Sequence, residues 1–194
     1  MSAYSFFFAL VIGVIVAMFR VSPVPPLRII GTVYVETFRN TPLFAQLLLW
    51  GFGLTKVGIQ FGFFTTAVIA MSLYTGSFVA ETIRAGMLSI PQGQAEAARS
   101  LGLGFGQSAK EVILPQALRT VTAPIGSLFI ANHKNTAICQ VLGVAELTFI
   151  ADQVGIDSAQ PTQALLGAAF CYLVITYPAG LLVGVLERKV AIKR

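Results

Sequence analysis

Apolar residues run through this chain in five long stretches that are separated by shorter polar segments. Because a helix rises about 1.5 Å per residue, roughly 20 apolar residues cross the hydrocarbon core of a bilayer. We therefore expect five membrane-spanning helices, at residues 3 to 19, about 41 to 55, 62 to 83, about 118 to 145, and 163 to 186. The second apolar core is too short to cross alone, so it must borrow from the preceding GTVYVETF segment or lie in a protein-lined break.

The composition supports this interpretation, since 56% of the residues are hydrophobic and only 11% are charged. It predicts an all-α, polytopic membrane bundle that forms a single domain over residues 1–194, without an internal repeat or a soluble domain. The net charge of +5 could suggest a nucleic-acid-binding protein, but the basic residues lie between apolar segments and form no basic face. We therefore expect a lipid bilayer, and no nucleic acid, among the partners.

The basic residues also indicate the orientation in the membrane. Eleven of the 13 lie between the first and second spans, between the third and fourth, or at the C-terminus. The opposite side holds Lys56 and an acidic segment from 146 to 162. Because loops rich in Lys and Arg remain in the cytoplasm, we expect the N-terminus outside and the C-terminus inside.

The polar segment from Arg84 to Arg119 is then cytoplasmic, and its residues predict two short helices that meet at a corner. AEAARSL favours a helix, and Gly102 is placed to end it in the left-handed conformation. A second helix is expected from Gly106 to about Ile113, with Pro115 opening the next span. This shape suits docking to a partner, but an amphipathic loop that lies on the headgroups fits it equally well.

At this point the residues show a resemblance to a known family. The spacing of Glu96-Ala97-Ala98, Gly102, Val112 and Leu114-Pro115 resembles the EAA loop in permease subunits of ATP-binding cassette (ABC) importers, where Ile is more usual than Val112. Further segments resemble the polar amino acid branch, and glutamate-type permeases most of all. These segments are FRNTPL at 38 to 43, SLYTGSFVAETIRAG at 72 to 86, LPQALR at 114 to 119, HKNTAI at 133 to 138 and LGVAEL at 142 to 147.

The resemblance implies a type I ABC importer permease in the plasma membrane of a prokaryote, acting as half of a pore. It implies as partners an ATPase dimer, a second permease that is related but different, and an extracytoplasmic amino acid binding protein. The chain has no GxxxxGK[ST] phosphate loop, so we expect no enzyme activity here, no cofactor, and ATP with Mg bound by the separate ATPase. The coupling segment is about 85–117, and its expected contact residues are Glu96, Ala97, Ala98, Arg99, Gly102, Leu114 and Pro115.

Lys134 is the main candidate for the substrate pathway, because it falls near the middle of the fourth span. A charged Lys there is expected to face the bundle interior, a cavity or an anion, although pairing with a carboxylate or with backbone carbonyls would also explain it. The resemblance implies that an acidic residue follows this Lys in many relatives. Asn135 keeps hydrogen-bonding capacity without that negative charge, so the pair favours an anionic side chain and predicts glutamate as the substrate.

Five further charged or titratable residues are weaker candidates. Glu81 and Arg84 are spaced for an ion pair that either anchors the helix end or contacts the substrate, and Glu36 and Arg39 repeat this spacing. His133, the single histidine, is expected to be packed more often than to relay protons, and no catalytic triad or metal site surrounds it.

Two other classes of protein remain open at this point. One is a self-sufficient secondary transporter or channel that uses Lys134, His133 and Glu81 as an ion or proton route. The other is a membrane scaffold whose cytoplasmic loop recruits a partner without any transport.

Overall fold

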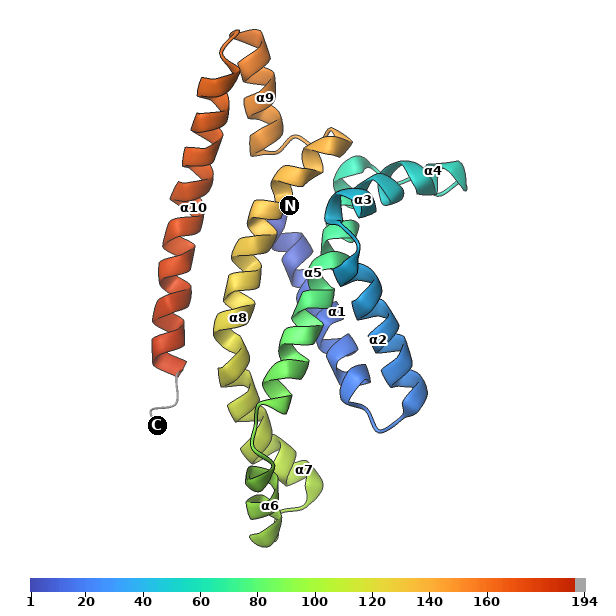
Figure 1. Ribbon diagram of the computed structural model, residues 1–194, viewed down its shortest axis with the longest axis vertical. Helices are drawn as coiled ribbons and strands as arrows, with labels where there is room; N and C mark the ends of the chain where they lie inside the picture. Colours follow the sequence, from blue (N-terminus) through green and yellow to red (C-terminus); the bar gives the residue numbers. More distant parts are fainter. Residues whose placement is uncertain (191–194) are drawn as a thin grey trace.

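The computed structural model describes residues 1–190, and every regular element within them is helical (Figure 1). The α-helices are α1 (Ser2–Val21), α2 (Pro25–Asn40), α3 (Leu43–Leu48), α4 (Leu54–Lys56), α5 (Phe63–Leu88), α6 (Gln92–Ser100), α7 (Phe105–Gln107), α8 (Leu114–Asn135), α9 (Leu147–Asp157) and α10 (Pro161–Val190). Two π-helical segments, η1 (Leu49–Gly53) and η2 (Ser108–Ile113), and a 3₁₀ segment, η3 (Thr136–Leu142), join some of them.

Four stretches of helix are long and apolar enough to cross a membrane: Ser2–Val21, Phe63–Leu88, Lys110–Leu142 and Pro161–Lys189. They confirm the first, third, fourth and fifth expected spans. Pro115 lies in the first turn of α8 as expected, but the fourth span begins earlier because the π-helical segment η2 runs into α8 without a break. The turn before this proline is π-helical, and such a widened turn accommodates a residue that has no backbone N–H to donate.

The second expected span is wrong in its position. The helix that lies beside α1 and α5 is α2, whereas residues 43 to 56 form short helical pieces. Of these, α3 packs its buried Leu43 and Leu47 against α5 and η3, and α4 projects from the bundle (Figure 1). Pro42 explains the break, since the residue before a proline avoids helical geometry and Thr41 is extended at φ −102° and ψ 129°. The GTVYVETF segment therefore belongs to the second long helix, as the shortness of the apolar core required.

Close packing of small residues joins α1 to α5. A Cβ atom added at Gly13 would lie 2.4 Å from Cγ1 of Val79, and Ala9 and Ala80 are fully buried at the same contact. The helix α2 covers this pair from one side, where the hydroxyl of Tyr34 donates a hydrogen bond of 2.6 Å to the carbonyl of Leu73. These three helices form a packed unit.

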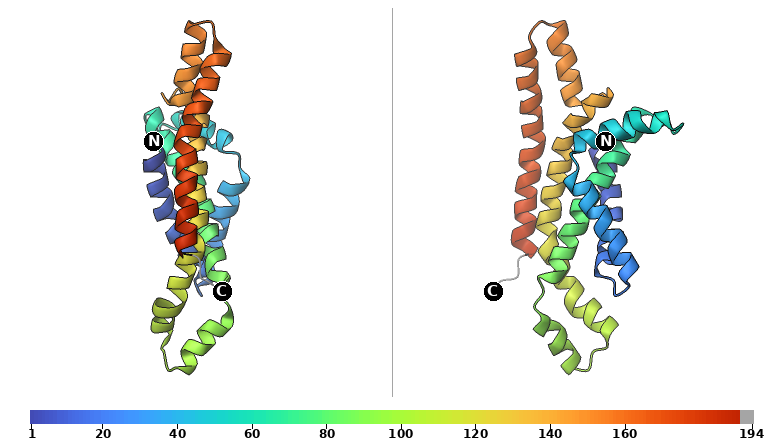
Figure 2. Two further views of the ribbon diagram at one scale, coloured as in Figure 1. Left: turned by 90° about the vertical axis from the view of Figure 1, so that its left-hand side faces the viewer. Right: turned by 45° about the vertical axis from the view of Figure 1, so that its right-hand side comes forward.

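The two ends of the bundle differ. The N-terminus, α3, α4 and α9 lie at one end, while α6, α7 and the end of α10 lie at the other, where the α6–α7 corner protrudes furthest (Figures 1 and 2). The segment from 146 to 162 was expected to be a loop but contains α9. Glu146 caps this helix, because its carboxylate accepts hydrogen bonds from the backbone N–H groups of Thr148 and Phe149 at 2.9 and 2.6 Å.

Candidate functional site

The first site is the corner between α6 and η2, in the predicted coupling segment. Gly102 has a φ of +82°, which L-residues rarely adopt, and so it turns the chain as expected. The N–H of Leu103 donates to the carbonyl of Ala98 at 3.1 Å, and the N–H of Gly102 donates to that of Arg99 at 2.9 Å. This is the Schellman pattern that satisfies the last carbonyls of a helix.

One face of α6 packs on the returning chain. Ala98 is 3% exposed and Ser108 is buried, and the hydroxyl of Ser108 donates to the carbonyl of Leu103 at 3.3 Å. The amide of Gln116 reaches back to the side-chain oxygen of Gln94 at 3.4 Å. The corner is therefore a folded unit fixed to the start of α8.

The opposite face of α6 is open. Glu96, Ala97, Arg99 and Gly102 are exposed, and so is Pro115 at the start of α8. Leu101 is 82% exposed, which leaves a large apolar side chain beside charged ones at the most prominent point of the bundle. Leu114 is 48% exposed. Of the expected contact residues, only Ala98 is buried by the chain itself; the others are displayed on the surface. Leu101 also belongs to this surface. The sequence offered no reason to select it, because a single apolar residue in a polar segment forms no pattern.

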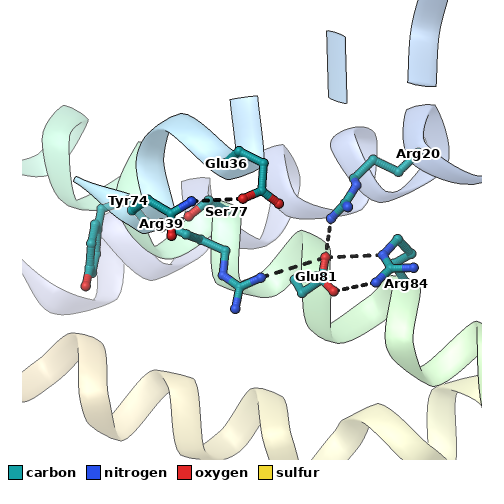
Figure 3. A network of polar contacts seen from close by, with 8 residues as sticks. Arg20, Glu36, Arg39, Tyr74, Ser77, Glu81 and Arg84 are labelled. Carbon is teal, nitrogen blue, oxygen red and sulfur yellow. Dashed lines mark hydrogen bonds and ion pairs between the residues drawn. The ribbon is translucent and has the colours of Figure 1, made fainter. Parts of the chain in front are cut away.

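The second site is centred on Glu81 of α5. Its carboxylate lies among three guanidinium groups, from Arg20 of α1, Arg39 of α2 and Arg84 of α5 (Figure 3). Arg84 donates to both carboxylate oxygens, through Nε at 3.2 Å and Nη2 at 2.5 Å, and Arg20 donates to Oε2. The expected pair of Glu81 and Arg84 is present, but it is part of a larger ion-pair network that connects three helices.

The expected pair of Glu36 and Arg39 is not formed. The carboxylate of Glu36 accepts from the amide of Asn40 at 2.8 Å, while Arg39 points toward α5. There its Cζ lies 5.2 Å from the ring centroid of Phe78 and its Nη1 lies 3.9 Å from Glu81 Oε2. Spacing alone did not reveal this partner, which lies 42 residues away along the chain.

A buried amide joins the outer halves of three helices. The side chain of Asn132, 1% exposed, donates to the Ser2 carbonyl at 3.1 Å and the Ser5 hydroxyl at 3.0 Å, and accepts from Thr75 at 2.9 Å. Ser72 adds a hydrogen bond of 3.2 Å to the carbonyl of Ser5. Sequence reasoning noticed the polar run NHKNT but not this member, which is the most buried of the five.

The third site is a cavity of about 120 Å³ between α5 and α8, close to the Glu81 cluster. It is lined by Tyr74, Thr75, Phe78, Leu128, Ala131, Asn132 and Asn135. Asn135 therefore lines the same cavity as Tyr74 and Phe78, whose ring centroids are 5.0 Å apart. The cavity combines an apolar wall with amide and hydroxyl groups, as sites for small polar molecules do.

Lys134 does not face the interior of this chain. Its side chain is exposed and it does not line the cavity, although its neighbour does. Successive side chains on a helix point about 100° apart, so Lys134 lies at the edge of the cavity face formed by Ala131 and Asn135. The expectation of a Lys buried inside the bundle is wrong for the single chain, and this Lys stands on the surface beside the cavity.

His133 packs in the last turn of α8, away from Glu81. Its Nδ1 lies 3.2 Å from the hydroxyl of Ser2, and its ring meets the edge of Tyr172 at a centroid distance of 5.8 Å. Nε2 is buried without a hydrogen-bond partner among the described residues. Tyr172 donates to Glu146 at 2.9 Å, so His133 belongs to the contact between α8, α10 and the cap of α9.

These features define a class of protein: a polytopic helical membrane protein with a protruding helical corner at one end and a small, mainly apolar cavity with a few polar groups among its spans. The sequence profile of the family described as "Binding-protein-dependent transport system inner membrane component" matches residues 9–192. The chain belongs to this family.

Individual relatives agree with the family. The chain is 38% identical over 208 residues to the glutamate transport system permease protein GluC of Corynebacterium glutamicum, with 100% of this chain and 91% of that protein covered. It is also 38% identical over 179 residues to a Bacillus subtilis protein named "Probable glutamine ABC transporter permease protein GlnM", covering 92% of this chain and 83% of that protein. A chain in the crystal structure of an amino acid ABC transporter with histidines is 33% identical, with a TM-score of 0.93 over 97% of this chain and 88% of that one.

The chain is thus a permease subunit of an amino acid ABC transporter, with the type I importer fold, and a multi-pass protein of the inner membrane. Permeases of this class work with a separate ATPase. Membership of the family also sets aside both other interpretations, the self-sufficient transporter or channel and the scaffold.

Proposed function

We propose that this permease forms half of an ATP-driven import path for acidic amino acids, with glutamate as the first substrate. The observation that carries the proposal is Asn135, which lines the cavity between α5 and α8 directly beside the exposed Lys134. A cationic ammonium and a neutral amide together favour a carboxylate, whereas an acidic residue in place of the amide would repel it.

The exposure of Lys134 supports a path that a second permease completes. A charged Lys within a membrane-spanning stretch is costly against lipid, so the exposed Lys134, in the last turn of α8, is expected to face water or protein in the assembled transporter. We infer that the second permease, a related but different chain, covers this side of α8. The cavity of the single chain is then one wall of a shared path.

The exposed face of α6 supports coupling to the ATPase dimer. Glu96, Arg99 and Leu101 project from the end of the bundle that the basic residues assign to the cytoplasm. An exposed apolar side chain such as Leu101 beside charged side chains is typical of a protein–protein contact. The ATPase would bind ATP and Mg, and closure of its two subunits would move α6 and, through Ser108, the base of α8. At the opposite end, an extracytoplasmic binding protein would deliver the amino acid.

Replacement of Lys134 tests the substrate class. The complete transporter, with its ATPase, both permeases and the binding protein, is reconstituted in proteoliposomes, and uptake of labelled glutamate is compared between wild type and Lys134→Ala. A charge-assisted hydrogen bond contributes about 1.5–3 kcal/mol, so uptake is expected to fall about tenfold or more. The control is Lys56→Ala, which removes an exposed Lys of α4 that does not line the cavity and is expected to leave uptake unchanged. Wild-type uptake by Lys134→Ala removes this residue from the mechanism.

A further inference from the structure

The ion pairs around Glu81 are unequal in charge. One carboxylate faces Arg20, Arg39 and Arg84, and the nearby carboxylate of Glu36 is bonded to Asn40 instead. The group therefore holds a formal excess of two positive charges where three helices meet, and its four side chains are partly exposed. Such an excess attracts an anion.

Arg39 is the member that is held most loosely. Arg20 and Arg84 donate hydrogen bonds to Glu81, whereas Nη1 of Arg39 is 3.9 Å from Oε2, beyond hydrogen-bond distance. The side chain of Arg39 is also the most exposed of the three, at 36% against 11% for Arg20 and 28% for Arg84. A guanidinium carries five N–H donors and can grip a carboxylate with two of them, so Arg39 has donors to spare.

Phe78 fixes the position of Arg39 relative to the cavity. This ring lines the cavity that contains Asn135, and the guanidinium of Arg39 lies over it at 5.2 Å. Along α5, the cavity residues Thr75 and Phe78 come first and Glu81 follows one turn later, toward the end of the bundle that carries α6. The guanidinium therefore lies between Phe78, which lines the cavity, and Glu81.

We propose that Arg39 is a second anion-binding residue of the pathway, which receives the carboxylate of the substrate through paired N–H groups as the substrate leaves the Asn135 cavity. This proposal rests on the proposed acidic substrate. Transfer of Arg39 to the substrate leaves Glu81 paired with Arg20 and Arg84, so this partly exposed carboxylate keeps two partners. Because the cluster holds three arginines and one carboxylate, Arg39 can leave Glu81 at a small cost in free energy.

The test compares Arg39→Gln with wild type in the complete reconstituted transporter, and Arg28→Gln serves as the control. Arg28 is exposed on the same helix, so its replacement makes the same change of charge away from the cavity. Glutamate uptake by Arg39→Gln is expected to fall tenfold or more, while ATP hydrolysis stimulated by the loaded binding protein stays within twofold of wild type. Arg28→Gln should match wild type in both measurements.

The outcomes separate this proposal from the proposed function. A wild-type transporter that imports glutamine but not glutamate refutes the acidic substrate itself. If the wild type imports glutamate and Arg39→Gln imports it equally well, the role of Arg39 alone is refuted. A parallel loss of uptake and ATP hydrolysis in Arg39→Gln also refutes that role, because it indicates that Arg39 only stabilises the structure. Should Arg39→Gln fail to insert, Arg39→Lys keeps the charge beside Glu81 but loses the paired donors; its uptake should fall severalfold, and wild-type uptake overturns the proposal.

Discussion

Gly102 offers the sharpest perturbation of the coupling corner, because its replacement acts on the backbone alone. Its φ of +82° is unfavourable for any residue with a Cβ, yet no heavy atom lies within 4 Å of the position that a Cβ would take. Gly102→Val therefore causes no clash. An L-residue in the left-handed conformation costs about 1–2 kcal/mol, which lowers the population of the corner about 5- to 30-fold.

The corner lies outside the spans, so the Gly102→Val protein should insert into the membrane normally and still bind its partner subunits. What should fall is the number of substrate molecules imported per ATP hydrolysed, measured with the loaded binding protein in proteoliposomes. Gly93→Ala is the matched control, because Gly93 lies in α6 with equally open space around it but with helical φ. Gly102→Asn should lie between wild type and Val, since Asn tolerates this conformation best among residues with a side chain. Normal coupling in Gly102→Val would refute the claim that the shape of this corner transmits the motion.

Three further predictions follow from packing and charge. Asn132→Ala leaves the hydroxyl of Thr75 without its buried acceptor and should destabilise the protein by about 0.6–2 kcal/mol, which lowers the midpoint temperature of thermal aggregation in detergent. An unchanged midpoint would show that the amide is dispensable. Gly13→Val forces side chains into Val79 and should destabilise the α1–α5 contact by about 1–3 kcal/mol, while Gly167→Ala, with open space around it, should be neutral in the same assay. Glu96→Arg reverses an exposed charge of α6 and should reduce co-purification of the ATPase without changing the amount of permease in the membrane; undiminished recovery would place the contact elsewhere.

The long apolar spans could be predicted because each is continuous in the sequence and needs no partner to be recognised. The helix α2 could not be placed in the same way, since Arg28, Glu36 and Arg39 lower its hydropathy. Its position depends on Glu81 and Leu73 of α5, which contact Arg39 and Tyr34 of α2 and lie far away in the chain. A local pattern does not contain such contacts.

The sites follow the same division. Gly102 was predictable because the end of a helix is a local feature, and its left-handed φ confirms the expectation. The depth of Asn132 and the exposure of Lys134 were not, because both depend on how α8 is rotated against α1 and α5. The helix α9 was missed because its segment is short and flanked by polar residues, although the acidic cap Glu146 was a usable signal.

The most direct test of the account is the effect of Asn135→Asp on ATP-dependent uptake by the complete transporter in proteoliposomes. Labelled glutamate is supplied with the binding protein, whose own affinity for glutamate is unchanged by a substitution in the permease. A new carboxylate in the cavity should repel the substrate and reduce glutamate uptake tenfold or more, while the protein still inserts and still binds its ATPase. Glutamate uptake equal to that of wild type would contradict the claim that this cavity selects an acidic amino acid.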